Sequence, residues 1–386
     1  MCDTLYAGSA ISLEGHEWFA KNSDRNPAES QSLCIVPAGP SAPELSFALS
    51  KPSWMEGGEM GVNQMGVAIG NEAVFSRFAA KKDGVLGMAI LREALSRSRT
   101  AAEARDFICD FVGRRDQGGN GAYKGSLVYS NSFLVSGTDG AFVIETAARR
   151  WAWKTVKSFA SISNAYSIEN DYDAVDEMSK VELSGSGRSW RALVEERLHL
   201  FFTKGDDRRN YTSGVLGAAA PSVDFPTIAA ALRGHSAGGR SMSGPCLHDA
   251  GFPIKSSTTA SMIFERDRSG GASGILWFTG TPYPCLSVFA PLLLTEDGFV
   301  PLWDGYDYSE GSKGPLARWE LARKKALERG GVTRASDPDF VAARERVQKK
   351  IAVAAHEAAA APRSKDSLAE ARREIDAAMA AWEPAL

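Results

Sequence analysis

Short apolar runs alternate with glycine, asparagine and aspartate from residue 4 to about residue 145, a pattern typical of proteins built on β-sheets. One strand is expected to begin at Thr4, almost at the start of the chain. Further strands are predicted at residues 7–13, 17–21 and 32–36, with a turn at Glu14 and Gly15. The segment 61–69 is predicted to be a hairpin, because residues 63–66 have turn-forming side chains.

A helical region is predicted next. Residues 86–96 carry apolar side chains at helical spacing, and Thr100 with Glu103 forms a capping box for a helix that extends to about Val112. The Asp139-Gly140 pair then predicts a β-hairpin. The other elements expected before residue 295 are strands at 126–135, 141–146, 151–156, 159–162, 259–265, 274–278 and 287–294, and helices at 190–202 and 228–232.

The composition changes beyond Lys313 to alanine, arginine, lysine and glutamate. Asp337-Pro338 predicts a helix that continues to about Ala361, and a capping box that starts at Ser367 predicts a final helix to Trp382. These helices carry charges of both signs, which favours packing or contacts within a homo-oligomer over membrane binding. We therefore expect a β-rich α/β domain at residues 2–312 and a C-terminal helical extension at 313–386.

Charge excludes several function classes. The 386 residues include 44 Lys+Arg and 47 Asp+Glu, a formal net charge of −3, which gives no basic surface for nucleic acid and no polybasic membrane signal. No apolar run approaches the roughly 20 residues that span a bilayer. The chain opens Met1-Cys2-Asp3-Thr4, without the basic and apolar segments of a secretory signal, so a cytoplasmic location is expected.

The five cysteines are widely scattered and contain no C-x-x-C pair, which favours free thiols over disulfides. If Met1 is removed, Cys2 becomes the first residue and offers both a thiol and a free α-amine. Such an amine titrates near 7.7 to 8.0 and can act as the base for its own thiol. The alternative is a frayed chain end that happens to contain cysteine.

Polar residues at three strand ends could serve such a nucleophile. Lys21 and Asp24 place a cation and a carboxylate three residues apart, although they are equally compatible with a solvated strand end. Asn71 and Asn164 each follow an apolar strand. They are either turn formers or donors to the oxyanion of an amide hydrolase.

Other motifs are weaker. Residues 234–238 fit the G-x-S-x-G nucleophile elbow, but a helix-like segment precedes them and no helix follows. Cys246 and His248 are potential zinc ligands, but no second cluster at metal spacing accompanies them, so no metal is expected and a loop at the substrate cleft suits them better. The glycines of 117–121 lack the Gly-Lys-Ser/Thr of a phosphate loop.

Several ordered segments resemble the secernins and the related cysteine dipeptidases, within the N-terminal nucleophile hydrolases. The resemblance begins at Met1-Cys2-Asp3-Thr4 and Lys21-Asn22-Ser23-Asp24-Arg25, with Glu29 and Gln31. It continues in blocks at residues 54–63, 66–74, 131–134, 145–147, 162–164, 258–262 and 278–282.

The resemblance implies a four-layer αββα sandwich with Cys2 as the nucleophile. It implies that Asp24 holds the α-amine and the thiol, that Asn71 and Asn164 stabilise the oxyanion, and that Lys21 replaces an arginine of related amidases. Arg188 resembles a second active-site arginine that follows a serine-rich turn. The expected activity is hydrolysis of an amide in a small peptide, most simply a dipeptide, without cofactor or metal. The alternatives are an N-acyl amidase of the penicillin and bile-salt amidase type, or a non-catalytic regulatory protein.

Overall fold

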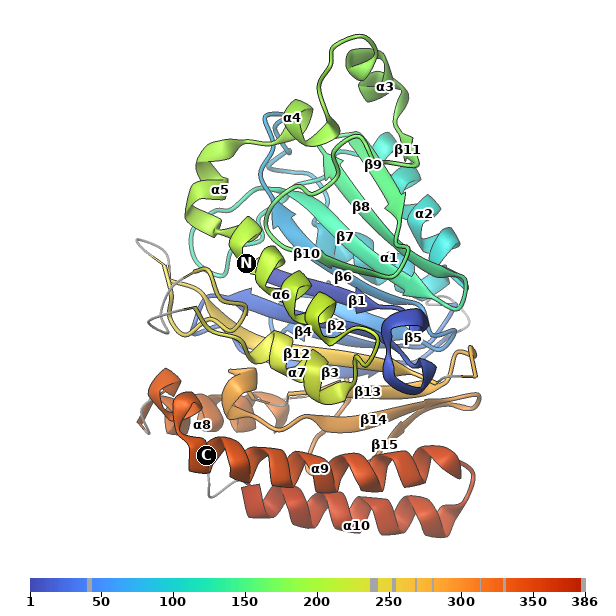
Figure 1. Cartoon of the computed structure of the whole chain (residues 1–386), viewed down its shortest axis with the longest axis vertical. Helices are drawn as coiled ribbons and strands as arrows, with labels where there is room; N and C mark the ends of the chain where they lie inside the picture. Colours follow the sequence, from blue (N-terminus) through green and yellow to red (C-terminus); the bar gives the residue numbers. More distant parts are fainter. Residues whose placement is uncertain are drawn as a thin grey trace.

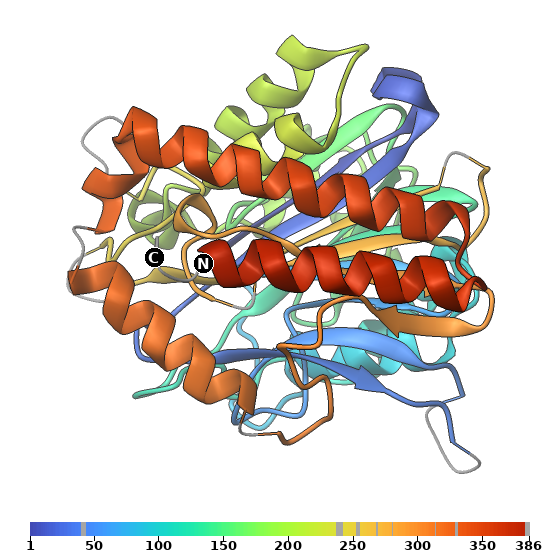
Figure 2. The same ribbon diagram turned by 90° about the horizontal axis from the view of Figure 1, so that it is seen from below.

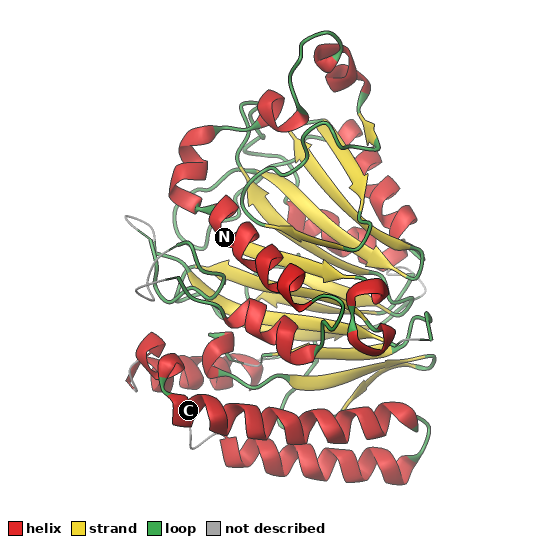
Figure 3. Cartoon of the chain, in the orientation of Figure 1, coloured by secondary structure: helices red, strands yellow, loops and turns green. Residues whose placement is uncertain are grey.

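Two antiparallel β-sheets stacked face to face form the centre of the molecule in this computed structural model (Figures 1 and 3). The structure describes residues 1–39, 44–236, 242–251, 255–267, 269–279, 281–312, 314–328 and 331–382. The first sheet has the strand order β10 (Phe159–Ile162), β1 (Cys2–Ala7), β2 (Glu17–Arg25), β12 (Ser257–Arg266), β13 (Gly274–Phe278), β14 (Ala290–Thr295) and β15 (Gly298–Pro301). The second has the order β11 (Ala174–Val175), β9 (Arg150–Thr155), β8 (Gly140–Ala147), β7 (Ser130–Gly137), β6 (Ala68–Val74), β5 (Met60–Asn63), β4 (Phe47–Pro52) and β3 (Gln31–Val36).

Helices cover the outer face of each sheet. The second sheet is covered by α1 (Gly87–Arg97) and α2 (Ala101–Arg114), and the first by α6 (Gly205–Ala219) and α7 (Phe225–Arg233). Three short helices precede α6 in the chain: α3 (Glu177–Leu183), α4 (Trp190–Val194) and α5 (Arg197–Thr203). The predicted four-layer αββα sandwich is confirmed.

Residues on neighbouring positions of one strand belong to different cores. Leu134 and Val143 pack between the two sheets, whereas Phe133 and Ile144 pack against α1 and α2. Successive side chains of a strand point to opposite faces, so a strand buried on both sides shows no polar alternation. This explains why the central strands read as continuous apolar runs.

The last two C-terminal helices lie along the first sheet, and the one before them packs on β3 of the second sheet. Figure 2 shows α9 (Pro338–Ala360) and α10 (Lys365–Trp382) side by side, with α8 (Gly314–Glu328) crossing the same side of the molecule. Helix α9 packs on β13 and β14, and Ile351, Ile375 and Trp382 are buried in the same apolar core as the first sheet. The predicted boundary at Lys313 falls on a residue outside the described set. Within the described residues, no helix combines the length and the apolar character needed to cross a membrane.

Most predicted elements are present, with three local differences. The first strand is Cys2–Ala7, and the predicted strand at 7–13 is instead two short 3-10 turns, Ser9–Ile11 and Leu13–Gly15, that follow Gly8. The predicted helix at 190–202 is divided into α4 and α5, because the Glu196 carboxylate caps a new helix. The last helix starts at Lys365, since the Ser364 hydroxyl, and not that of Ser367, accepts the capping hydrogen bond.

One ion pair between the tail and the sheet is expected to make stability depend on pH. His356 Nε2 of α9 lies 3.0 Å from Glu265 Oε1 of β12, and this hydrogen bond raises the pKa of His356. A histidine whose pKa is higher in the folded chain than in the unfolded chain stabilises the folded chain. This stabilisation is complete below the unfolded-state pKa of about 6.5 and is lost as the pH rises through the folded-state pKa. Because the imidazole is 45% exposed, His356→Ala should cost only a few tenths of a kcal/mol. Urea unfolding should show that cost at about pH 5.5 and not at about pH 8.5; an equal cost at both would contradict the assignment.

Candidate active site

Cys2 is the first residue of β1 in the first sheet, and two neighbouring strands hold β1 in place. Strand β1 pairs with β2 on one side and β10 on the other, and Cys2 lies directly opposite Ser23. The residue is only 4% exposed. The alternative of a frayed terminus is therefore excluded, because the strand fixes the chain from its second residue.

The register of β1 and β2 divides the neighbouring side chains between two faces. Residues directly opposite each other in an antiparallel pair share a face, so Cys2, Thr4, Lys21 and Ser23 lie together. Buried contacts of Lys21 and Thr4 with Glu72 of β6 identify this as the face between the sheets. The alternate residues, Asp3, Asn22 and Asp24, belong to the opposite face, which packs under helices α6 and α7.

A buried charge cluster surrounds the thiol on the inter-sheet face. Lys21 Nζ lies 3.2 Å from Glu72 Oε1, and both side chains are completely buried. Burial alone would lower the pKa of Lys21, but the Cys2 sulfur and the Glu72 carboxylate raise it, so the ammonium stays charged. The Cys2 thiol donates to Glu59 Oε2 over 3.6 Å, and Glu59 in turn accepts from Arg25 at 2.9 Å.

The thiol itself is protonated at neutral pH in this state. Burial raises the pKa of Cys2 to about 11, an effect that the Lys21 ammonium partly opposes and the Glu59 carboxylate reinforces. A thiol needs to lose its proton to act as a nucleophile. The site therefore needs a base close to Cys2. In the chain with Met1 attached, the Cys2 nitrogen is a peptide N–H and cannot be that base.

The Cys2 nitrogen is held from the helix side of the sheet. It donates to Asn164 Oδ1 over 2.8 Å, and the same oxygen accepts from Arg208 Nη2 at 2.6 Å. Arg208 Nε also contacts both carboxylate oxygens of Asp3, at 3.0 and 3.1 Å. All of these side chains are buried. This network fixes the position of the Cys2 nitrogen, which would be the α-amine of a chain without Met1.

Asp24 lies beside the terminus but faces away from the thiol. Its backbone carbonyl accepts from the Met1 amine at 2.6 Å, and its Oδ1 accepts from Thr258 at 2.5 Å. The other carboxylate oxygen, Oδ2, is buried without a hydrogen-bond partner among the described residues. Burial raises the pKa of Asp24 to about 6, although the positive chain terminus opposes this. The placement fits a partner for an amine and does not fit a partner for the thiol.

The two predicted asparagines are differently engaged. Asn164 uses its amide oxygen on Cys2 and one N–H on the Ala73 carbonyl, at 2.7 Å. Asn71 donates one N–H to Asn131 at 3.1 Å, and its own Oδ1 is buried without a partner among the described residues. A side-chain amide has two N–H groups, so each asparagine keeps one that these bonds do not use. Asn164 is beside Cys2, but Asn71 lies opposite Phe133, so its side chain is on the α1 and α2 side of the second sheet and faces away from the thiol.

The structure does not bring Arg188 to this site. Arg188 is exposed in the loop before α4, where its backbone N–H donates to Ser186 Oγ. The buried arginine of the site is Arg208 on α6, which the sequence analysis missed. Its signal was a stripe of residues at helical spacing, Gly205, Arg208, Thr212 and Leu216, all of which are buried. An arginine on the buried face of a helix indicates a buried partner of opposite charge, because arginine is almost never fully buried unless it is paired.

The structure also locates the remaining sequence motifs. Gln117 Oε1 accepts from the Asn131 amide and from Thr146, and so holds a loop against the second sheet. Helix α7, and not a strand, precedes the G-x-S-x-G sequence, which excludes the nucleophile elbow. Residues 237 and 238 of that motif lie outside the described residues.

Known proteins share parts of this sequence and this arrangement. Residues 12–119 match the model of a family described as acyl-coenzyme A:6-aminopenicillanic acid acyl-transferase. A variant of the conjugated bile acid hydrolase from Clostridium perfringens is similar in structure, at 11% sequence identity and a TM-score of 0.50, over 80% of this chain and 98% of that one. Penicillin V acylase from Agrobacterium tumefaciens is similar at 12% identity and a TM-score of 0.45, over 78% of this chain and 92% of that one. The fold is that of the N-terminal nucleophile hydrolases.

Proposed function

We propose that this protein is a cysteine amidase in which Cys2, freed by removal of Met1, is the N-terminal nucleophile. The observation that carries the proposal is the position of Cys2 itself. Its thiol and its backbone nitrogen are each held by buried polar partners, Glu59 and Asn164, at the first residue of β1. A residue with only a structural role has no need for two such partners.

Each step of the proposed reaction uses a group of this site. The α-amine takes the proton of the Cys2 thiol, and the sulfur attacks the amide carbonyl, which becomes an oxyanion that Asn164 stabilises with its unused N–H group. The carbon–nitrogen bond then breaks, and the ammonium returns its proton to the leaving amine. Water attacks the resulting thioester, the amine accepts the proton of that water, and the acid leaves as the thiol is restored.

Two electrostatic effects support this cycle. The Lys21 ammonium faces the sulfur and favours the thiolate over the thiol. The unpartnered Oδ2 of Asp24 is an acceptor placed beside the terminus, where it can hold the charged amine. Arg208 acts through Asn164 and Asp3, and we propose it as a positioning residue.

We favour an N-acyl compound as substrate over a dipeptide. The family model that matches residues 12–119 is named for an acyl-transferase, and the similar structure is named as a hydrolase of a conjugated acid. The dipeptide alternative rests on the resemblance of blocks such as residues 54–63 and 66–74 to cysteine dipeptidases. The regulatory alternative assigns no chemistry to the buried charges around Cys2.

A matched substrate panel separates these functions. The processed chain, beginning at Cys2, is given N-acyl glycines and X-Gly dipeptides, which release the same amine. We expect kcat/KM to be at least about 10-fold higher for the best N-acyl glycine than for the best dipeptide. A dipeptide carries an ammonium group, and burial of that charge near the Lys21 ammonium is unfavourable, whereas the acyl group carries no such charge. Hydrolysis of dipeptides alone would identify a dipeptidase. Hydrolysis of neither, by a chain with a free Cys2 amine, would favour the non-catalytic alternative.

A further inference from the structure

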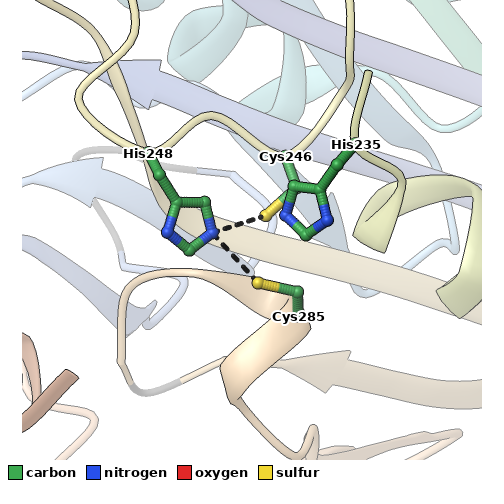
Figure 4. Close-up of side chains that lie close together, drawn as sticks. All are labelled: His235, Cys246, His248 and Cys285. Atoms are coloured by element: carbon green, nitrogen blue, oxygen red, sulfur yellow. Dashed lines mark hydrogen bonds between the residues drawn. The ribbon is translucent and has the colours of Figure 1, made fainter. Parts of the chain in front are cut away.

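Four side chains that can bind a metal ion meet in one place outside the candidate active site. His235 follows helix α7, Cys246 and His248 lie on the loop before β12, and Cys285 belongs to a 3-10 turn, Pro284–Leu286. One ligand atom from each lies within 4.8 Å of all the others, and all but His235 are fully buried. Figure 4 shows the two sulfur atoms and the two imidazole rings facing a common centre.

Hydrogen bonds alone do not satisfy this cluster. His248 Nε2 lies 3.0 Å from the Cys285 sulfur and 3.5 Å from the Cys246 sulfur, but one ring nitrogen carries at most one proton. His235 Nε2 is buried and has no hydrogen-bond partner among the described residues. A cation at the centre would satisfy both histidines and both sulfur atoms.

The backbone around the cluster is fixed before any ion binds. The Cys246 N–H donates to the Gly234 carbonyl at 2.9 Å, which ties the Cys246 loop to the His235 segment. Arg344 of α9 donates to the Cys285 carbonyl, and the His248 ring stacks on Tyr283 with centroids 4.3 Å apart. Ligands on restrained backbone lose little entropy when they bind an ion.

The charge balance of the site selects the kind of ion. Arg233 and Arg344 lie beside Cys285, and both donate to the one carboxylate of Glu345. An added divalent charge would be repelled here unless both thiols became thiolates. Two thiolates and two neutral imidazoles make a complex of Zn²⁺ with no net charge, which is compatible with burial.

We propose that His235, Cys246, His248 and Cys285 bind one Zn²⁺ in a closed, tetrahedral, structural site. Bonds of about 2.3 Å to sulfur and about 2.0 Å to nitrogen place ligand atoms about 3.3 to 3.8 Å apart. The separations within 4.8 Å therefore narrow by at most roughly an ångström, and the 3.0 Å distance between His248 Nε2 and the Cys285 sulfur widens slightly. Four protein ligands leave no open position for water or substrate. The sequence shows no further ligands near Cys246 and His248, but the structure places His235 and Cys285 beside them from distant parts of the chain.

The proposed zinc site would stabilise the loop around Cys246, which contacts β2 and β12 close to Cys2. Pro245, next to Cys246, accepts a hydrogen bond from Asn22 of β2 at 2.8 Å. Leu247 pairs with Thr258, whose hydroxyl donates to Asp24. Zinc would thus fasten the loop on which the position of Asp24 depends, without taking part in the reaction.

Metal content of the full chain tests the proposal. The protein is expressed with added zinc and purified under reducing conditions without chelator, and we expect about one zinc per chain. Cys246→Ser and Cys285→Ser should each retain less than about a tenth of it. The matched controls are Cys34→Ser and Cys109→Ser, which replace buried thiols outside the cluster and should keep full zinc content. Cys2→Ala should also keep it, so this result does not depend on the amidase proposal.

Cobalt gives a second measurement on the unchanged protein, which covers the case of variants that fail to fold. Titration of the metal-free chain with Co²⁺ should produce thiolate-to-cobalt absorption and intense tetrahedral bands that saturate at about one equivalent. The absence of both zinc and these bands would overturn the proposal. Equal metal loss in the Cys109→Ser control, or a Cys246–Cys285 disulfide in the reduced preparation, would overturn it as well.

Discussion

Replacement of Cys2 by alanine is expected to reduce amide hydrolysis by at least about 10⁴-fold, because the sulfur is the atom that attacks the carbonyl. The fold should survive, since the change removes one buried atom and leaves the backbone pairing of β1 with β2 and β10 intact. We expect the free energy of unfolding to change by no more than about 2 kcal/mol. Initial rates on the best substrate measure the loss of activity, and urea unfolding measures the change in the free energy of unfolding.

Cys109→Ala is the matched control for this variant. Cys109 is also a buried free thiol, but it lies on α2 in the core beneath the second sheet. Its replacement should leave the rate within about twofold of the unchanged protein, since it touches nothing in the site. A Cys2→Ala protein that keeps more than about one per cent of the rate would show that another residue is the nucleophile.

The second large effect is expected from Arg208→Ala. Arg208 is completely buried, and its removal leaves the Asp3 carboxylate buried without its cation. Breaking a buried ion pair in this way costs about 3–5 kcal/mol of stability. The rate should also fall, because Asn164 loses the partner that orients it toward the Cys2 nitrogen. Urea unfolding and kcat measured on the folded fraction test the two parts separately.

Neighbouring arginines provide controls for Arg208. Arg209→Ala removes a partly exposed ion pair with Asp206 and should cost less than about 1 kcal/mol. Arg188→Ala should leave kcat unchanged, because its side chain lies on an exposed loop. Arg208→Lys keeps the charge but cannot make the fork-shaped contacts to Asp3 and Asn164, so its kcat should stay low while part of the stability returns. Full activity in Arg208→Lys would contradict a positioning role.

Local patterns were enough to predict the elements near the nucleophile. The strand that begins beside Cys2, the helix cap at Thr100 and the hairpin at residues 61–69 each depend on a few adjacent residues, and the structure confirms all three. Lys21 lies near Cys2 because Lys21 is opposite Thr4 in the pairing of β1 with β2. The predicted strand at 7–13 with a turn at Glu14 and Gly15 gives a different register, because residues 9–15 form two 3-10 turns instead.

The features that the sequence analysis missed are set by contacts between distant segments. Arg208 lies 205 positions from Asp3 along the chain, and Cys285 lies 37 from His248. Neither pair has a spacing that a motif could reveal, since the packing of α6 and of the 3-10 turn on the first sheet brings them together. Arg188 was favoured because a serine-rich turn precedes it, but a local turn does not determine which arginine the fold buries.

The central claim is that Cys2 works only as the first residue, with its own amine as the base. The direct test is the hydrolysis rate of the chain that begins at Cys2, compared with the same chain that retains Met1, each verified by intact mass. We predict activity in the first and a loss of at least about 10³-fold in the second, because a peptide nitrogen cannot accept the proton. Equal rates would contradict this account and would make Glu59, which already accepts from the thiol, the base in its place.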